Sequence, residues 1–527
     1  MKTILSKLKK YSLLLATSCL LIVASDSAGL LSTPSAILTA TPTSNPASNI
    51  TASQDIQTLQ IEIEKKKLTV SERALFSAPG SYQRKSNPTK EYAEGEIAIK
   101  FKPDTSENKR AEIISKYNGK IRSVLQTGTR ILTGIETGRE KQILEELKLN
   151  PDVEYADLIG VVSQQEIGSG GSGASVNPAP PPQCGTPNDE WYCNNYQHNL
   201  VQISASVGWW WNKGSSSTII AILDSGIDYN HPDLDQKIWK NQAELQGNAN
   251  QDDDGNGYVD DIQGWDFMGS GSNNQDNNPM DEKDHGTFVA GIAAAETNNY
   301  TGIAGINWHA KIMNVKVLGS DGFSFGDSVI QGIYYAAQNG AKIINISSSG
   351  QSNYLANDFQ QAVNEARTVY GAVIIASTSY NQSNPYNGNC FIGLPAGTSD
   401  VISVSALNTD GTDAGTCQQY SYGGVQYQKL QTSAPGENVY STTKEAGGYT
   451  SLGYGQGPAT SWAAPHVAGI ASILYSCVPT QNQSLKLEII ENTLRYGGRD
   501  YGATGWDNKF GYESANLYEA LDFANCF

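Results

Sequence analysis

The sequence is poor in charged residues and in histidine. Only 17% of its 527 residues are charged, and five are His. Basic residues are the minority, with 36 Lys and Arg against 53 Asp and Glu, so the formal net charge is −17. A nucleic-acid-binding protein needs a basic footprint, and this balance argues against that class. The hydrophobic fraction of 39% is enough for a large buried core and argues against a disordered or fibrous chain.

Long apolar stretches are also scarce. The one that stands out covers residues 11–24, with lysines before it and small residues after it. It is shorter than the roughly 20 residues that a membrane span requires, and the layout is typical of a secretory signal peptide. We therefore predict a signal peptide over residues 1–28, a secreted protein, and no membrane association once the signal is removed; an uncleaved anchor is the alternative.

Cysteine is infrequent, with seven residues, one of which (Cys19) lies within the apolar run. The other six are an even number in a chain expected to be exported, which favours disulfides. Six cysteines allow 15 pairings. Closeness in sequence favours Cys184–Cys193, Cys390–Cys417 and Cys477–Cys526, and the absence of a CxxC pair among them disfavours a metal site.

Composition divides the chain into segments. Residues 29–89 are rich in Ser, Thr, Pro and Ala, which predicts a low-complexity tether. Residues 167–183 are rich in Gly and Ser and then in Pro, which predicts a flexible and then stiff linker. The charge changes at the same linker: the net charge is +3 up to Glu166 (22 basic against 19 acidic residues) and −20 beyond it (14 against 34).

The segment 90–166 has the pattern of a small α+β domain. Strand patterns at 96–101, 121–124, 129–134 and 153–162 alternate with helical spacing at 106–117 and 139–149. The order β-α-β-β-α-β predicts a ferredoxin-like domain.

The segment 184–527 has the pattern of an α/β domain. Apolar, β-branched strands at 218–223, 310–317, 342–346, 372–376 and 401–404 alternate with helical stretches. This alternation predicts a parallel sheet with helices on both faces.

Three short segments of this domain place a reactive residue where a strand ends or a helix begins. Asp224 ends an apolar strand, His285 opens a helix of small residues, and Ser461 lies at the start of another. Singly they fit a strand-ending carboxylate, a capping or core histidine and an N-cap serine. Together they occur in the order Asp, His, Ser, which is one of the chain orders of a catalytic triad.

These segments resemble the subtilisin family of serine proteases, in its thermitase-like branch. The stretch Ala459–Gly469 departs from the usual family motif mainly at Ala459 and Trp462, and the resemblance extends over residues 186–520. It implies a secreted endopeptidase that hydrolyses peptide bonds through an acyl-enzyme on Ser461. His285 would be the general base and then acid, and Asp224 would orient it.

The resemblance also covers residues 90–166, which look like the family's inhibitory propeptide. It implies a monomeric zymogen whose partners are its own propeptide and a protein or peptide substrate. In the family, residues 347–350 would line the primary specificity pocket, and Ser348 and Ser349 make that wall more polar than usual. We expect removal of the propeptide by cleavage around residues 166–182.

One departure concerns the oxyanion donor. The family has an Asn after the strand at 372–376, and here that position falls on Tyr380 without a gap or on Asn381 with a one-residue insertion. An alternative hypothesis is therefore a pseudoprotease that binds peptide or protein in its cleft with little turnover. A structural or adhesive surface protein is a third.

Two segments predict calcium sites. Asp252, Asp254 and Asn256 precede Gly257 as in the first half of an EF-hand loop, although Gln263 stands where the closing Glu would be. By resemblance to the thermitase-like branch, a second site would use the side chains of Asp189, Asp233 and Asn299. Main-chain oxygens of Glu296, Thr301 and Ile303 would complete that site.

Overall fold

The computed structural model describes residues 91–164, 185–269, 275–350, 354–379, 392–414, 421–422, 425–426, 429–444, 448–452 and 459–527. The predicted signal peptide, tether and linker lie outside these residues.

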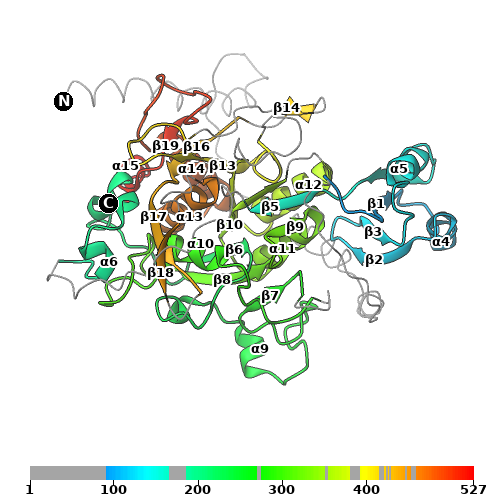
Figure 1. Cartoon of the computed structure of the whole chain (residues 1–527), viewed down its shortest axis with the longest axis horizontal. Coiled ribbons are helices and arrows are strands. Elements are labelled where there is room, and N and C mark those ends of the chain that lie inside the picture. The colour runs from blue at the N-terminus through cyan, green and yellow to red at the C-terminus, as the bar shows by residue number, and fades with distance from the viewer. Residues whose placement is uncertain are drawn as a thin grey trace, which may run out of the picture. The chain divides into compact units, whose positions relative to one another are not determined.

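The first domain has the predicted ferredoxin-like order. Its four-stranded sheet has the spatial order β2-β3-β1-β4, with both partners of β1 antiparallel to it (Figure 1). The two helices close an apolar core that contains Ile97 and Ile99 of β1 and Leu147 of α5. The elements are β1 (Glu96–Phe101), α4 (Glu107–Lys116), β2 (Lys120–Val124), β3 (Arg130–Thr133), α5 (Glu140–Lys148) and β4 (Val153–Asp157).

The last strand differs from the prediction. The expected single strand at 153–162 is two strands, β4 and β5 (Val161–Gln164). β5 leaves the first sheet and lies between β9 (Phe323–Phe325) and β11 (Ser348–Gly350), antiparallel to both. A run of apolar residues does not show which sheet it joins, so the sequence pattern missed the break.

The second domain is built on an eight-stranded sheet in which every pairing is parallel, as predicted. In spatial order the strands are β19 (Glu513–Ser514), β16 (Thr432–Pro435), β13 (Val401–Leu407), β12 (Val373–Ser377), β10 (Ile343–Ile346), β6 (Ile219–Asp224), β8 (Lys311–Lys316) and β7 (Gly264–Asp266).

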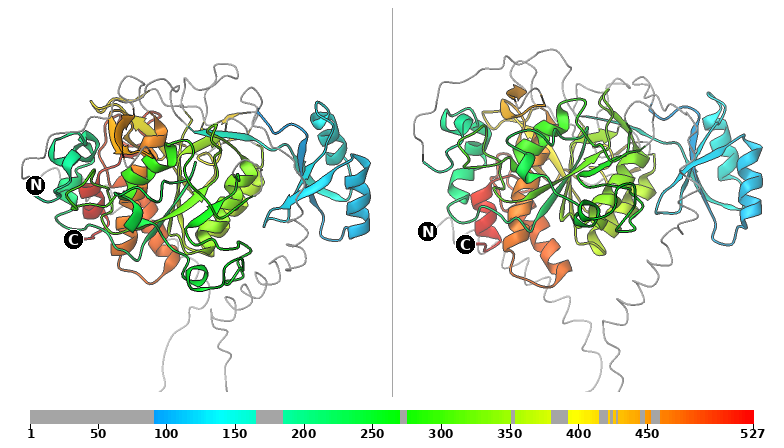
Figure 2. Two further views of the ribbon diagram at one scale, coloured as in Figure 1. Left: turned by 60° about the horizontal axis from the view of Figure 1, so that its bottom comes forward. Right: turned by 90° about the horizontal axis from the view of Figure 1, so that it is seen from below.

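Helices cover both faces of this sheet (Figure 2). On β6, Ile220 and Ile222 face the core under one helix layer, whereas Ala221 and Leu223 face the core under the other. The first layer contains α10 (His285–Ala294), α13 (Thr460–Cys477) and α14 (Gln483–Tyr496); the second contains α11 (Gly326–Gln338) and α12 (Ala356–Thr368). Burial on both faces explains why these strands are continuous apolar runs.

Small residues let α10 and α13 pack closely. Every residue of α10 is buried. A Cβ on Gly291 would lie 2.3 Å from Oγ1 of Thr442, and one on Gly469 would lie 2.6 Å from Cβ of Ile306. Both distances are shorter than any normal contact, so these positions need glycine for the helices to approach their neighbours.

Short elements connect the layers. They are α6 (Glu190–Cys193), α7 (His198–Gln202), α8 (Ala205–Gly208), α9 (Gln242–Gln246), α15 (Leu517–Phe523), a 3₁₀ turn (Asp235–Lys237), and the strand pairs β14 (Ser421–Tyr422) with β15 (Val425–Gln426) and β17 (Val439–Thr442) with β18 (Tyr449–Leu452). Among the described residues, no helix is both long and apolar enough to cross a membrane.

A disulfide joins Cys477, the last residue of α13, to Cys526 near the C-terminus, as closeness in sequence suggests. Cys193 is also disulfide-bonded. Its expected partner Cys184, and the expected pair Cys390–Cys417, lie outside the described residues.

Removal of the Cys477–Cys526 bond should lower stability. The bond closes a loop with a sequence separation of 49 residues, and such a loop restricts the unfolded chain. We expect Cys477→Ser with Cys526→Ser to lower the free energy of unfolding by roughly 2 to 4 kcal/mol. Calorimetry in a Ser461→Ala background would measure this without self-digestion, and an unchanged melting temperature would contradict it.

Candidate active site

A buried carboxylate–imidazole pair lies at the carboxyl end of β6. Asp224 is the last residue of β6 and His285 is the first of α10, and both are almost fully buried. Nδ1 of His285 lies 2.6 Å from Oδ1 of Asp224. The proton on Nδ1 therefore points to the carboxylate, which leaves Nε2 as the basic nitrogen.

Ser461 lies at the start of α13, next to the residue of that helix that contacts His285. It is the second residue of that helix, since Ala459 is the N-cap, so the N-cap interpretation of Ser461 is wrong. Its hydroxyl donates to the carbonyl of Ser347 (2.8 Å), and the hydroxyl of Ser347 donates to the carbonyl of Ser461 (3.0 Å). The next residue, Trp462, packs its ring 4.9 Å from the ring of His285, centroid to centroid.

A second buried carboxylate, Asp281, holds the start of α10 in place. Its Oδ2 accepts from the main-chain N–H (2.9 Å) and the hydroxyl (2.6 Å) of Thr287, and its Oδ1 accepts from the hydroxyl of Ser225 (2.8 Å). Ser225 in turn accepts from the N–H of Gly286 (2.9 Å). The residues that follow Asp224 and His285 are thereby tied together.

Strand β5 of the first domain lies between β9 and β11, close to the residue that bonds to Ser461. Val162 pairs with Gly350 on one side and Ser324 on the other, and Gln164 pairs with Ser348. Ser347 immediately precedes β11, and its carbonyl accepts from the hydroxyl of Ser461. The second domain therefore holds this extended segment by main-chain pairing on both of its edges, and the segment leads toward the serine.

The first domain also docks on the N-terminal ends of two helices. Asp358 on α12 is buried and accepts from Thr127, Thr129 (2.8 Å) and Tyr155. On α11, Asp327 accepts from Arg122 (2.5 Å).

These polar contacts surround an apolar one. Ala98, Leu125 and Ile131 of the first domain belong to the same buried cluster as Phe359 of α12 and Val329 of α11. The first domain is thus bound through its sheet as well as through β5.

The side chains of the second predicted calcium site are together. Asp189 and Asp233 are fully buried, and burial raises the pKa of Asp189 to about 6 and that of Asp233 well above its usual range. The amide of Asn299 donates to Asp233 (2.9 Å), and the N–H of Asn299 donates to Asp189 (3.2 Å).

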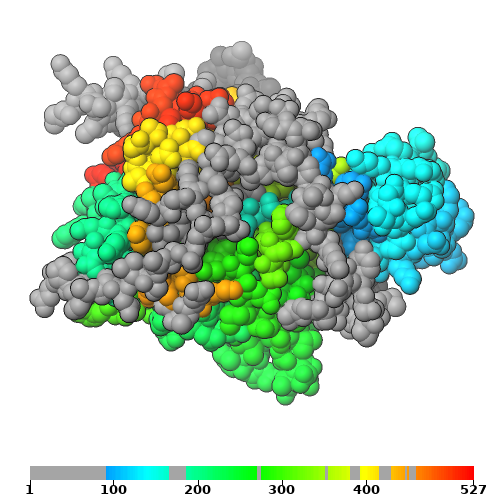
Figure 3. Space-filling model, viewed as in Figure 1, coloured from blue at the N-terminus to red at the C-terminus, as the bar shows by residue number. Residues whose placement is uncertain are grey.

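The acidic loop after α9 is arranged differently from the prediction. Carboxylate oxygens of Glu244, Asp254 and Asp261 all lie within 4.8 Å of one another. Asp252 is not in this cluster; its carboxylate accepts from the N–H of Gly257 (2.8 Å). Asn256 donates its amide to Asp254 and Asp261 (both 3.1 Å) and so borders the cluster. The loop and α9 are at the molecular surface (Figure 3).

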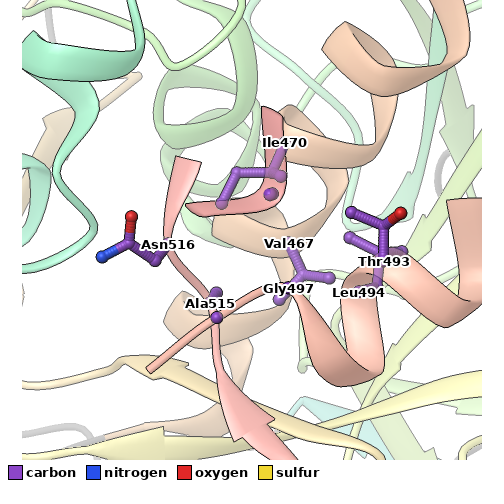
Figure 4. Close-up of a pocket in the computed structure, with 9 residues that line it drawn as sticks. Val467, Ile470, Thr493, Leu494, Gly497, Ala515 and Asn516 are labelled. Carbon is purple, nitrogen blue, oxygen red and sulfur yellow. The ribbon is translucent and has the colours of Figure 1, made fainter. Parts of the chain in front are cut away.

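A small cavity lies between α13 and α14, lined among others by Val467, Ile470 and Leu494 (Figure 4). Its volume is about 10 Å³, which is room for at most about one water molecule. It is therefore not a substrate site.

Several site residues carry no local signal. Trp462 and Asp281 are single residues whose role depends on neighbours from other segments, and Glu244 and Asp261 lie on either side of the acidic run. For Trp462, its departure from the family motif was the one sequence feature that set it apart. Tyr380 and Asn381, the two candidates for the oxyanion position, lie outside the described residues.

Comparison with known proteins agrees with this geometry. Residues 215–512 match the model of the subtilase family, and residues 79–158 match that of the fervidolysin N-terminal prodomain. The chain is 30% identical over 439 residues to a thermophilic serine proteinase of Bacillus sp. (strain AK1), covering 82% of this chain and 88% of that protein. It is 36% identical over 291 residues to thermitase of Thermoactinomyces vulgaris, covering 55% and 86%.

A solved structure shows the same fold. Fervidolysin from Fervidobacterium pennivorans, described as a keratinolytic enzyme related to subtilisin, superposes with a TM-score of 0.57 at 23% identity. The match covers 82% of this chain and 61% of that one.

The fold, the prodomain and the relatives define a serine peptidase with an N-terminal propeptide. The chain belongs to the subtilase family and is a subtilisin-like serine endopeptidase of the thermitase-like type.

The prodomain should dissociate more readily as the pH rises. Asp157 accepts from the N–H of Leu355 in the second domain (3.0 Å), and burial raises its pKa to about 6. Once the prodomain leaves, this pKa returns to roughly 4. The bound state thus takes up a proton between pH 4 and 6, so binding is strongest below this window and weakens through it.

We expect the dissociation constant of the processed prodomain to rise roughly 10- to 100-fold from pH 4 to pH 7. Size-exclusion chromatography of the processed, noncovalent complex at several pH values would measure it. Asp157→Asn should flatten this part of the profile, and an equally steep profile in that variant would contradict the assignment.

Proposed function

We propose that this endopeptidase is secreted and stabilised by calcium, that it is made as a zymogen, and that Asp224, His285 and Ser461 perform its chemistry. The observation that carries the catalytic assignment is the buried Asp224–His285 pair at the end of β6, together with the contact between His285 and Trp462, the residue next to Ser461 on α13.

In this mechanism, Oγ of Ser461 bonds to the carbonyl carbon of the substrate while its proton passes to Nε2 of His285. The imidazolium then protonates the leaving nitrogen as the C–N bond breaks, which leaves an acyl-enzyme. Water attacks next: its proton goes to His285, its oxygen bonds to the carbonyl carbon, and Ser461 leaves with the proton. Asp224 keeps Nδ1 protonated and offsets the charge of the imidazolium throughout.

The position of β5 supports a zymogen. An extended segment of the prodomain fills the cleft that an extended substrate would need, so it inhibits by occupation. Because β5 runs past Ser348 toward Ser347 and Ser461, cleavage is expected within the first residues after Gln164. This agrees with the expected boundary near residue 166.

The primary specificity pocket is proposed to be polar. Ser348 and Ser349 of β11 are fully buried, and the hydroxyl of Ser349 is 2.9 Å from that of Ser379, which follows β12. Hydroxyls therefore stand where the family usually has Leu and Gly.

The proposal for self-processing is tested by intact mass. Wild type and Ser461→Ala precursors would be purified in calcium and weighed, with sequencing of any new N-terminus. We expect the wild type to lose its first 165 to 185 residues or so while Ser461→Ala stays whole, because acyl transfer needs the hydroxyl.

The other outcomes are informative. If both proteins stay whole, the pseudoprotease hypothesis is favoured, and processing of both alike would assign the cleavage to another protease. Hydrolysis of a peptide by the wild type that persists in Ser461→Ala would contradict the role of Ser461.

The donor set of the Asp189–Asp233 site fits a hard cation. Two buried carboxylates lie next to an amide, and a carboxylate whose pKa is raised by burial is stabilised in its charged form by a bound cation. Asp189, Asp233 and Asn299 would hold the ion after rotation of the Asn299 amide, which now donates to Asp233. Calcium there would tie the segment before α6 to the loop after α10.

The acidic loop offers a second set. Glu244, Asp254 and Asp261 are proposed as the ligands, in place of the expected Asp252, Asp254 and Asn256. Burial raises the pKa of Asp261 to about 6, so an ion would stabilise its charged form. Calcium bound to the folded state would stabilise the protein by mass action.

A pair of variants distinguishes the two ligand sets for the loop. In a Ser461→Ala background, calcium should raise the melting temperature of the parent and of Asp252→Asn by similar amounts, and that of Asp261→Asn by less. The quantity to compare is the increase on adding calcium, because Asp261→Asn also weakens its contact with Tyr335. A larger effect of Asp252→Asn would favour the EF-hand-like arrangement.

A further inference from the structure

Trp462 places an aromatic face against the imidazole of His285. The two ring centroids are 4.9 Å apart and the ring planes are inclined by 40°. Trp462 is only 2% exposed, and it also contacts Phe288, three residues beyond His285 on α10, at 4.4 Å. The indole is therefore held between the catalytic histidine and the next turn of the same helix.

The backbone of Trp462 is fixed as well. Its carbonyl accepts from Nδ1 of His466 (2.8 Å), and Nε2 of His466 accepts from the amide of Asn199 (2.8 Å). Burial lowers the pKa of His466 to about 4, so this histidine is neutral and keeps the arrangement at working pH. The main chain that carries the indole is thus held in place.

We propose that Trp462 is a positioning residue that holds the ring of His285 toward Asp224 and stabilises the imidazolium form through its π face. The inference rests on the proposed triad. A ring centroid within about 6 Å of a cation attracts it through the ring quadrupole, and the attraction is larger where water is excluded. At a pH where the resting imidazole is neutral, the imidazolium forms only while the acyl-enzyme forms or breaks down, so the contact then favours the transition state over the resting enzyme.

The charged groups around His285 do not depend on residue 462. Asp224 on β6 bonds to the imidazole itself, and Asp281 in the preceding loop is engaged with Ser225 and Thr287. Asp284, the N-cap of α10, accepts from the N–H of Lys444, which follows β17.

The buried lysine near this end of the sheet is also paired elsewhere. Lys316 on β8 is paired with Asp266 (3.3 Å) and Glu282 (2.9 Å). On α13 itself, His466 is neutral. A substitution at 462 therefore changes the side chain that packs against the imidazole of His285 and leaves the charged groups around the imidazole in place.

Two variants separate the π contribution from burial. Trp462→Leu keeps an apolar contact without a π face, and Trp462→Phe keeps the face. We expect Trp462→Leu to move the acid limb of the kcat/KM profile down by roughly half a pH unit, because the imidazolium loses its attraction. Its kcat should fall several-fold with KM nearly unchanged, and Trp462→Phe should follow the wild type.

A readout without turnover keeps the inference testable if a variant is slow. In a Ser461→Ala background, the Nδ1 proton of His285 would be followed by NMR as the pH is changed. The midpoint of this titration should be lower in Trp462→Leu than in the parent, by the same amount as the shift of the acid limb. Phe288→Leu is the matched control: it loosens the packing of Trp462 without changing the face toward His285, and should leave the midpoint in place.

An unchanged or raised midpoint in Trp462→Leu would overturn the inference, and so would equal shifts in all three variants. Failure of the triad is a separate result, since it would appear as activity in Ser461→Ala.

Discussion

The structure depends on burying a parallel sheet on both of its faces. Strands β6, β10 and β12 have a bonded neighbour on each edge and a helix layer on each face, so most of their side chains have apolar surroundings. Polar side chains are tolerated where these strands end. The carboxyl edge of the sheet is consequently where Asp224 meets the start of α10 and where the chain after β10 forms the cleft.

The same burial explains how the site is held. His285 and Ser461 come from α10 and α13, and Gly291 and Gly469 of these helices stand where a Cβ would collide with Thr442 and Ile306. Three separate contacts hold the imidazole of His285 and the main chain next to it. Asp224 bonds to Nδ1, Trp462 packs against the ring, and Asp281 holds the start of α10 through Ser225 and Thr287. Tight packing of these two helices keeps the main chain of His285 and Ser461 in place.

The prodomain uses three kinds of contact at once. Main-chain pairing places β5 in the cleft, carboxylates at the ends of α11 and α12 accept from the prodomain, and an apolar face joins the buried cluster of the second domain. Only the pairing of β5 resembles what a substrate can make. The other contacts let the prodomain bind more tightly than a peptide that has no such domain attached.

Local pattern along the chain was enough to determine much of this protein. The alternation of β-branched strands with helices identified the parallel sheet, and the prodomain order followed from the same periodicity, because both depend on residues close in sequence. The motifs around Asp224, His285 and Ser461 were readable for the same reason.

Tertiary structure decided the remainder. In the folded chain, β5 pairs with β9 and β11 and not with the prodomain sheet. Glu244 and Asp261, and not Asp252, lie beside Asp254 in the acidic cluster, and Trp462 packs against His285. Each of these contacts joins segments that are distant in sequence, and no local periodicity encodes which distant surfaces will meet when the core is packed.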